Sequence, residues 1–68
     1  MNQFKDRLNE ALAENKLSQN AFAQKISMSQ SIINNYCTEK REPSLNVLII
    51  ICKELNVSAD YLLGLSDY

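Results

Sequence analysis

The stretch that decides the fold runs from residue 18 to residue 36 and reads SQNAFAQKISMSQSIINNY. Its apolar residues recur at helical spacing in two short blocks, which predicts amphipathic helices over about residues 18–26 and 29–38. Ser18 and Ser29 stand where N-caps are needed, because a serine hydroxyl accepts from the free N–H groups of a first helical turn. Only Ser27 and Met28 separate the two helices. So short a connection predicts a helix-turn-helix motif over about residues 18–37.

The outward positions of the second of these helices are polar and uncharged. They are Gln30, Ser31, Asn34 and Asn35. Each of these side chains both donates and accepts hydrogen bonds, and base edges in the DNA major groove are read by that chemistry. The alternative for each is an ordinary solvated helix face, since exposed Ser, Asn and Gln are common.

Three further helices are predicted around the motif, over about residues 2–15, 45–55 and 59–64. Ser44 and Ser58 are placed to cap the last two, and Gly64 is placed to close the final one. The chain has 68 residues with one Gly and one Pro, so turn chemistry for a sheet is scarce. The expected fold class is therefore all-α, in a single domain.

Composition excludes several classes of function. There is no His, and Cys37 and Cys52 lack metal-ligand spacing, so neither a zinc site nor a catalytic site is expected. No cofactor is expected either. The N-terminus lacks an apolar signal segment, and the longest apolar run, residues 47–52, is too short to cross a bilayer. We expect a cytoplasmic protein that makes no contact with membranes.

The overall charge argues against nucleic-acid binding, because the formal net charge is −1 and such domains are often basic. Docking depends on the local field, however, and not on the sum of the charges. Lys25, Lys40 and Arg41 lie near the two helices of the motif, whereas most carboxylates fall in other segments. A basic reading face on an acidic body is the expected arrangement.

The helix expected over residues 45–55 carries more apolar residues than one core face needs. That face is assigned to Leu45, Leu48, Ile51, Cys52 and Leu55, which leaves Val47, Ile49 and Ile50, while Leu62, Leu63, Leu65 and Tyr68 add apolar surface. Three interpretations of this extra apolar surface stay open. The last helix covers it, or it forms a dimer patch that includes Val47, Ile50 and Leu65. In the third interpretation, a further segment of a longer chain packs on it.

The ordered set of these residues resembles the phage-repressor type of helix-turn-helix domain, the lambda and 434 repressor class also called the XRE or Cro/C1 family. The resemblance covers nearly the whole chain and is carried by Leu17-Ser18-Gln19, Phe22-Ala23, Ile26, Ser29-Gln30-Ser31, Ile33, Lys40, Pro43-Ser44-Leu45, Leu48, Leu55, Val57 and Ser58-Ala59-Asp60-Tyr61-Leu62-Leu63-Gly64. It implies a five-helix lambda-repressor-like fold. The ending from Ser58 is similar to the tail of many repressors from Gram-positive bacteria and their phages.

The resemblance also implies roles for individual residues. Base contacts are implied for Gln30, Ser31 and Asn35, with Ile32 against a thymine methyl group. Phosphate contacts are implied for Gln19, Asn34, Thr38, Lys40 and Arg41.

Three positions depart from the family pattern. Glu39 stands where family members often have a glycine, so it must adopt a strained left-handed conformation or the helix must end differently. Leu12 and Cys37 replace an Arg and a Glu that form a buried ion pair in the family, and we expect these two apolar side chains to touch. Ser27 replaces the usual turn glycine, so a less left-handed turn is expected.

The resulting hypothesis is a sequence-specific DNA-binding transcriptional regulator. A homodimer would bind a near-palindromic operator in double-stranded DNA, with the third helix of each copy in the major groove. A repressor of phage or mobile-element type is the expected kind. The alternative is a protein-interaction module, antitoxin-like or an anti-repressor partner, that has kept the fold without specific DNA binding.

Overall fold

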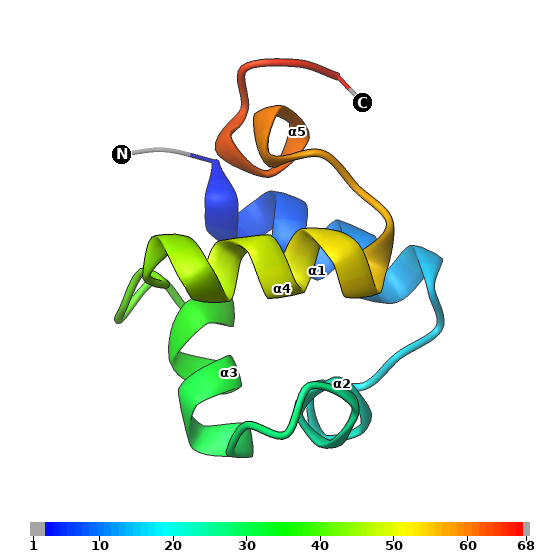
Figure 1. Ribbon diagram of the computed structural model, residues 1–68, viewed down its shortest axis with the longest axis vertical. Coiled ribbons are helices and arrows are strands. Elements are labelled where there is room, and N and C mark those ends of the chain that lie inside the picture. Colours follow the sequence, from blue (N-terminus) through cyan, green and yellow to red (C-terminus); the bar gives the residue numbers. More distant parts are fainter. Residues whose placement is uncertain (1–2, 68) are drawn as a thin grey trace.

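Five α-helices make up the computed structural model, which describes residues 3–67 (Figure 1). They are α1 (Phe4–Glu14), α2 (Gln19–Lys25), α3 (Gln30–Cys37), α4 (Leu45–Leu55) and α5 (Ala59–Leu63). No strand occurs within the described range, which confirms the all-α prediction. The predicted ranges differ from these chiefly by including cap residues. The predicted helix start at Asn2 and the apolar contribution of Tyr68 lie outside the described residues.

Serine side chains begin four of the five helices. The hydroxyl groups of Ser18, Ser29, Ser44 and Ser58 accept from backbone N–H groups three residues ahead, at N···O distances of 3.0, 3.3, 3.3 and 3.0 Å. All four serines have extended backbone angles, as N-caps require. These bonds confirm the predicted helix starts.

Left-handed residues end the helices, although only one of these residues is a glycine. Gly64 has φ of 83°, while Lys16, Ser27, Glu39 and Asn56 have φ between 56° and 67°. The N–H of the residue after each returns to a carbonyl of the helix just ended, as in Met28 N to Ala23 O at 2.9 Å. The prediction that Ser27 relaxes the turn was therefore wrong. The bond of Met28 fixes the backbone in the left-handed region whichever side chain stands at position 27.

The turn at Ser27 offers a test of this strain. Ser27→Gly is expected to raise the free energy of unfolding by about 0.5–1 kcal/mol, because a left-handed side chain costs roughly 1–2 kcal/mol and the added freedom of the unfolded chain offsets part of that. Two residues further along the chain, Ser29→Ala removes an N-cap and is expected to lower the free energy of unfolding by about 1 kcal/mol. Urea titrations of the two variants should thus move in opposite directions. A loss of stability in Ser27→Gly would show that the turn stores no strain.

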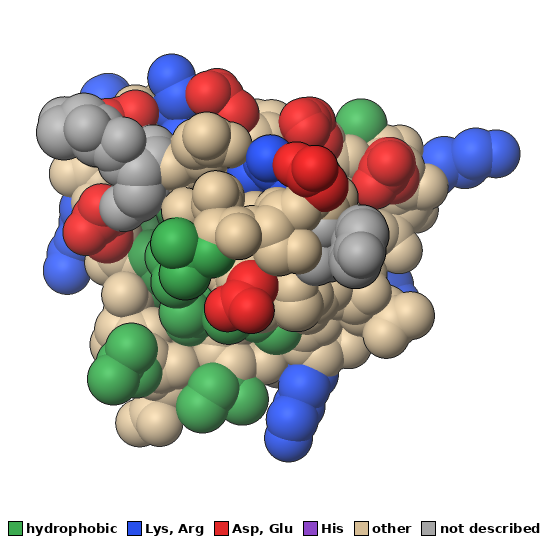
Figure 2. Space-filling view, turned by 90° about the horizontal axis from the view of Figure 1, so that it is seen from above, with side chains coloured by type: hydrophobic (Ala, Val, Ile, Leu, Met, Phe, Trp, Pro, Cys, Tyr) green, Lys and Arg blue, Asp and Glu red, His purple; other side chains and the backbone are tan. Residues whose placement is uncertain are grey.

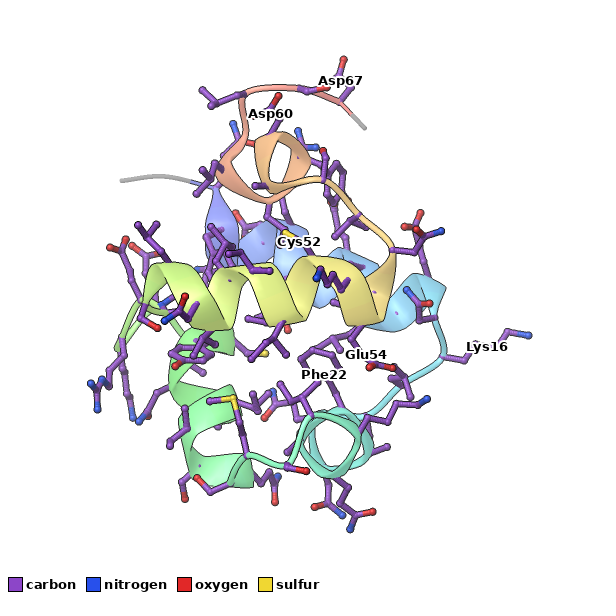
Figure 3. The ribbon with its side chains drawn as sticks, viewed as in Figure 1. Lys16, Phe22, Cys52, Glu54, Asp60 and Asp67 are labelled. Atoms are coloured by element: carbon purple, nitrogen blue, oxygen red, sulfur yellow. The ribbon has the colours of Figure 1, made fainter. Side chains whose placement is uncertain are left out.

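The core lies where α1 crosses the other helices. It consists of Phe4, Leu8, Ala11, Leu12, Phe22, Ala23, Ile33, Tyr36, Cys37, Ile51, Leu55 and Leu62. The side chain of Phe22 points from α2 toward α4 (Figure 3), and the Phe4 and Tyr36 rings meet edge-on with centroids 6.4 Å apart. Burial of these side chains holds α2 and α3 against the rest of the molecule.

Helix α4 keeps most of the predicted core face, since Leu48 and Cys52 also pack partly against the core. Ile51 and Leu55 are buried as expected, but Leu45 is 79 % exposed. Leu45 begins the helix beside the open 39–44 loop, at the rim of the core, so its assignment to the core was wrong. Val47, assigned to the surplus, packs partly against the core instead.

Helix α5 returns over α1 and α4 and fixes the C-terminal end. Arg7 lies over the Tyr61 ring at 4.5 Å, donates to the Ser66 carbonyl at 3.2 Å and approaches the Asp67 carboxylate at 3.8 Å. Leu62 is the fully buried residue of α5 and anchors that helix to the core. The helix does not cover all the surplus apolar surface, since Ile49, Ile50 and Leu65 stay exposed together with Leu45.

Candidate nucleic-acid interface

The outward face of α3 gathers the four polar side chains expected there. Gln30, Ser31, Asn34 and Asn35 line one open depression of about 280 Å³. Ile33, Tyr36 and Cys37 point into the core from the opposite side of the same helix. The 3.6-residue period alone separates the two faces. The depression therefore presents amide and hydroxyl groups on a rigid element.

A side-chain hydrogen bond braces α3 against the first turn of α2. The Asn34 amide donates to Gln19 Oε1 at 3.0 Å, and both residues are half-buried. The bond uses the acceptor of Gln19 and leaves its NH₂ group as a donor, and a phosphate oxygen accepts from such a donor. Asn34 thus supports the Gln19 side chain, and phosphate contacts of Gln19 and Asn34 stay predictions.

The loop after α3 is folded back onto the end of that helix. The Asn35 carbonyl accepts from the backbone N–H groups of Lys40 and Arg41, at 2.9 and 3.2 Å. These bonds place both cations beside the C-terminal end of α3. No salt bridge among residues 3–67 involves either side chain. Their charges are therefore not neutralised by a carboxylate of this part of the chain.

Two residues with expected DNA contacts are placed less favourably. The Thr38 hydroxyl donates to the Asn34 carbonyl at 2.8 Å, so this bond must break before Thr38 donates to a phosphate. Ile32 is half-buried and packs partly against the core. A thymine methyl group would meet only the exposed part of its side chain.

Helix α1 holds the end of α3 through a contact that sequence reasoning missed. The Asn9 amide donates to the Cys37 carbonyl at 3.0 Å and to the Lys5 carbonyl of its own helix at 2.9 Å. One turn earlier, Lys5 Nζ lies 3.8 Å from a carboxylate oxygen of Glu39. Nothing in the sequence distinguishes Asn9 from a solvated asparagine, because only the crossing of α1 and α3 brings the Asn9 amide to the Cys37 carbonyl.

Glu39 has the left-handed conformation that was one of the two expected alternatives, and Lys5 balances its charge. Leu12 and Cys37, which replace the family's ion pair, are both buried in the one core. Burial raises the pKa of the Cys37 thiol, so this side chain stays protonated and acts as a small apolar residue. A direct contact between Leu12 and Cys37 stays a prediction.

Asn9→Ala tests the contact between α1 and α3. We expect a loss of about 1 kcal/mol in the free energy of unfolding, because the Cys37 carbonyl loses its side-chain partner in a partly buried place. Asn46→Ala is the matched control, since Asn46 is an exposed asparagine on α4 and the change reports helix propensity alone. Chemical denaturation of both variants and of the wild type gives each change in the free energy of unfolding. Equal effects of the two substitutions would mean that the Asn9 bond contributes nothing.

Charge is distributed unevenly between the two ends of the molecule. Residues 15–38 contain Lys16 and Lys25 and no Asp or Glu. The opposite end, around α5, shows Asp and Glu side chains spread over its surface together with Lys and Arg side chains (Figure 2). Glu54 reaches from α4 toward α2 and pairs with Lys25 at 3.5 Å (Figure 3). The positive field near α3 therefore depends mainly on Lys40 and Arg41.

Within the described part of the chain no group of three or more His, Cys, Asp or Glu is arranged to hold a metal ion. Between residues 3 and 67, no helix is long and apolar enough to span a bilayer.

Comparison with known proteins identifies the arrangement. A family model described as helix-turn-helix matches residues 8–62. The chain is also 36 % identical over 61 residues to the uncharacterized HTH-type transcriptional regulator YobD of Bacillus subtilis (strain 168). That match covers 90 % of this chain and 54 % of the relative, so the chain spans about half of the relative's length. The family match includes both helices of the motif, their serine caps and all core residues from Leu8 to Leu62, and the chain therefore belongs to the XRE-type helix-turn-helix family.

Proposed function

We propose that this chain is a sequence-specific DNA-binding transcriptional regulator, a repressor of the type found in phages and mobile elements. The observation that carries the proposal is the outward face of α3, where Gln30, Ser31, Asn34 and Asn35 share one open depression. A helix fits the width of the major groove, and an amide side chain pairs with the donor and acceptor of adenine. Family membership and the regulator relative support the coarser part of the proposal, a DNA-binding regulator.

Residues on and beside α3 are suited to two kinds of DNA contact, with base edges and with phosphates. Gln30 and Ser31 at its first turn, with Asn35 one turn on, are assigned to base edges. Gln19, Lys40 and Arg41 flank the helix and are assigned to phosphates, which fix the register of the protein on the duplex. With few cations beside the helix, non-specific affinity is expected to be low. Recognition then depends on the amide contacts.

Occupancy of an operator is the proposed mechanism. Two copies place their α3 helices in successive major grooves about 34 Å apart on a near-palindromic site. RNA polymerase is then excluded from an overlapping promoter.

A protein-interaction module is the second candidate, and the exposed apolar side chains of Leu45, Ile49 and Leu65 favour it. In that case the α3 face is a solvated surface, and the apolar side chains bind a protein partner.

Selection of bound duplexes from a random pool at near-physiological salt separates the two candidates. An enriched inverted repeat with half-sites about one helical turn apart is the result expected of a dimeric regulator. A single enriched half-site would mean that a monomer binds. Absence of enrichment, with binding that disappears as salt is added, would overturn DNA reading and favour the interaction module.

A further inference from the structure

The loop that carries the two cations assigned to phosphates begins with a carboxylate. Glu39 directly precedes Lys40 and Arg41 in the chain. Its left-handed backbone, with φ of 67°, turns the chain from the end of α3 into this loop. Neighbouring Cα atoms are about 3.8 Å apart and charges act over about 10 Å at about 0.1 M salt, so the Glu39 charge reaches the same phosphates. Without a compensating cation it would oppose the DNA contacts of Lys40 and Arg41.

Helix α1 brings a positive charge to this carboxylate. Lys5 Nζ lies 3.8 Å from Glu39 Oε1, and the two side chains are 37 % and 36 % exposed. The same ammonium lies 3.9 Å from the Asp6 carboxylate, but the Asp6 side chain is 75 % exposed, so water screens that contact more strongly. Lys5 is thus the cation that α1 places at the end of α3.

A hydrogen bond one turn further along α1 fixes the approach of Lys5 to Glu39. The Asn9 amide donates to the Cys37 carbonyl at 3.0 Å and to the Lys5 carbonyl at 2.9 Å. Residues four apart share one face of a helix, so Lys5 and Asn9 both face the end of α3. The backbone of Lys5 is therefore held opposite Glu39, whereas its flexible side chain depends on the carboxylate for its direction.

We propose that Lys5 is a positioning residue for DNA binding, which holds and neutralises Glu39 so that Lys40 and Arg41 contact phosphates without an opposing charge. The proposal rests on the DNA-binding function proposed above and extends it to a residue of α1 that touches neither base nor phosphate. An ion pair with this exposure contributes little to folding. Its effect is expected in DNA affinity, because binding to the phosphate backbone depends on the charges beside it and on salt.

Lys5→Gln tests this role, with Lys53→Gln as its matched control. Each variant removes one positive charge from a helix surface, but Lys53 lies in the last turn of α4, whereas α3 lies toward the start of that helix (Figure 1). Fluorescence anisotropy on a mixed-sequence duplex of about 30 base pairs, at about 50 mM salt, should show roughly three- to tenfold weaker binding by Lys5→Gln and a change below about twofold by Lys53→Gln. Lys5→Arg keeps the charge and should bind like the wild type. Thermal midpoints of all three variants should stay within a few degrees of the wild type.

A second background separates action through Glu39 from a direct phosphate contact. Glu39→Gln should bind DNA at least as tightly as the wild type, because it removes the opposing charge. In that background Lys5→Gln should change affinity by less than about twofold, since the Lys5 side chain has lost the group that directs it. An equal loss in both backgrounds would show that Lys5 contacts a phosphate itself and would overturn the proposal. Equal weakening by Lys5→Gln and Lys53→Gln would overturn it too, since net charge alone would explain both.

The same titrations separate failure of this role from failure of the proposed function. A wild type that binds DNA no better than Lys5→Gln does would overturn the role of Lys5 alone. A wild type that binds all duplexes alike, with the expected loss in Lys5→Gln, would support that role and overturn sequence reading. A wild type that binds no duplex at about 50 mM salt would overturn both.

Discussion

Phe22→Ala is expected to lower the free energy of unfolding by about 3–5 kcal/mol. Phe22 is fully buried and is the largest of the side chains that the core encloses completely. Truncation leaves a cavity between α2 and the rest of the core that neighbouring backbone cannot fill, because both ends of α2 are held by caps and by the turns at Lys16 and Ser27. A domain of this size has about 3–10 kcal/mol of stability in all. The variant should therefore be near or beyond the point of unfolding at room temperature.

Thermal denaturation followed by circular dichroism measures this effect. A midpoint lower by about 15–30 °C is expected, since each kcal/mol moves a domain of this size by about 4–8 °C. Gln24→Ala, at an exposed position of the same helix, should change the midpoint by only a few degrees. If the midpoint of Phe22→Ala fell no further than that of this control, Phe22 would not hold α2 on the core.

Gln30→Ala is expected to weaken binding to the selected site by about 1–3 kcal/mol and to relax discrimination at one base position. Gln30 opens α3 and lines the outward depression, so truncation removes a bidentate donor and acceptor without touching the core. Binding isotherms on the selected duplex and on variants changed one base pair at a time give both quantities. Folding of the variant should be unaffected, because Gln30 is exposed.

Lys40→Ala is the control for Gln30→Ala, because it removes an assigned phosphate contact instead of an assigned base contact. Lys40 lies beside the C-terminal end of α3 and is assigned to a phosphate, so its loss should weaken all sequences alike and reduce the salt slope by about one. Unchanged affinity and specificity in Gln30→Ala would show that α3 is not the element that reads bases. Loss of specificity in Lys40→Ala would show that the two assignments are exchanged.

Helix positions followed from the sequence because their causes are local. A serine hydroxyl bonds an N–H group three residues away, so Ser18, Ser29, Ser44 and Ser58 mark helix starts whatever surrounds them. The polar face of α3 is local in the same way, since the helical period alone places Gln30 and Asn34 on the side away from Ile33.

Tertiary contacts decided what the sequence left open. Apolar periodicity predicted that α4 is partly buried but not where the core ends, so Leu45 was assigned inside and lies outside. The hydrogen bond of Asn9 to Cys37 joins residues 28 positions apart, and no local pattern reports it. The backbone at Ser27 follows from the bond between Met28 and Ala23, which outweighs the preference of a serine for negative φ. The sequence alone thus determined the helices and their polar faces, since short-range bonds set them, whereas helix crossings, set by packing, determined which apolar residues stayed exposed.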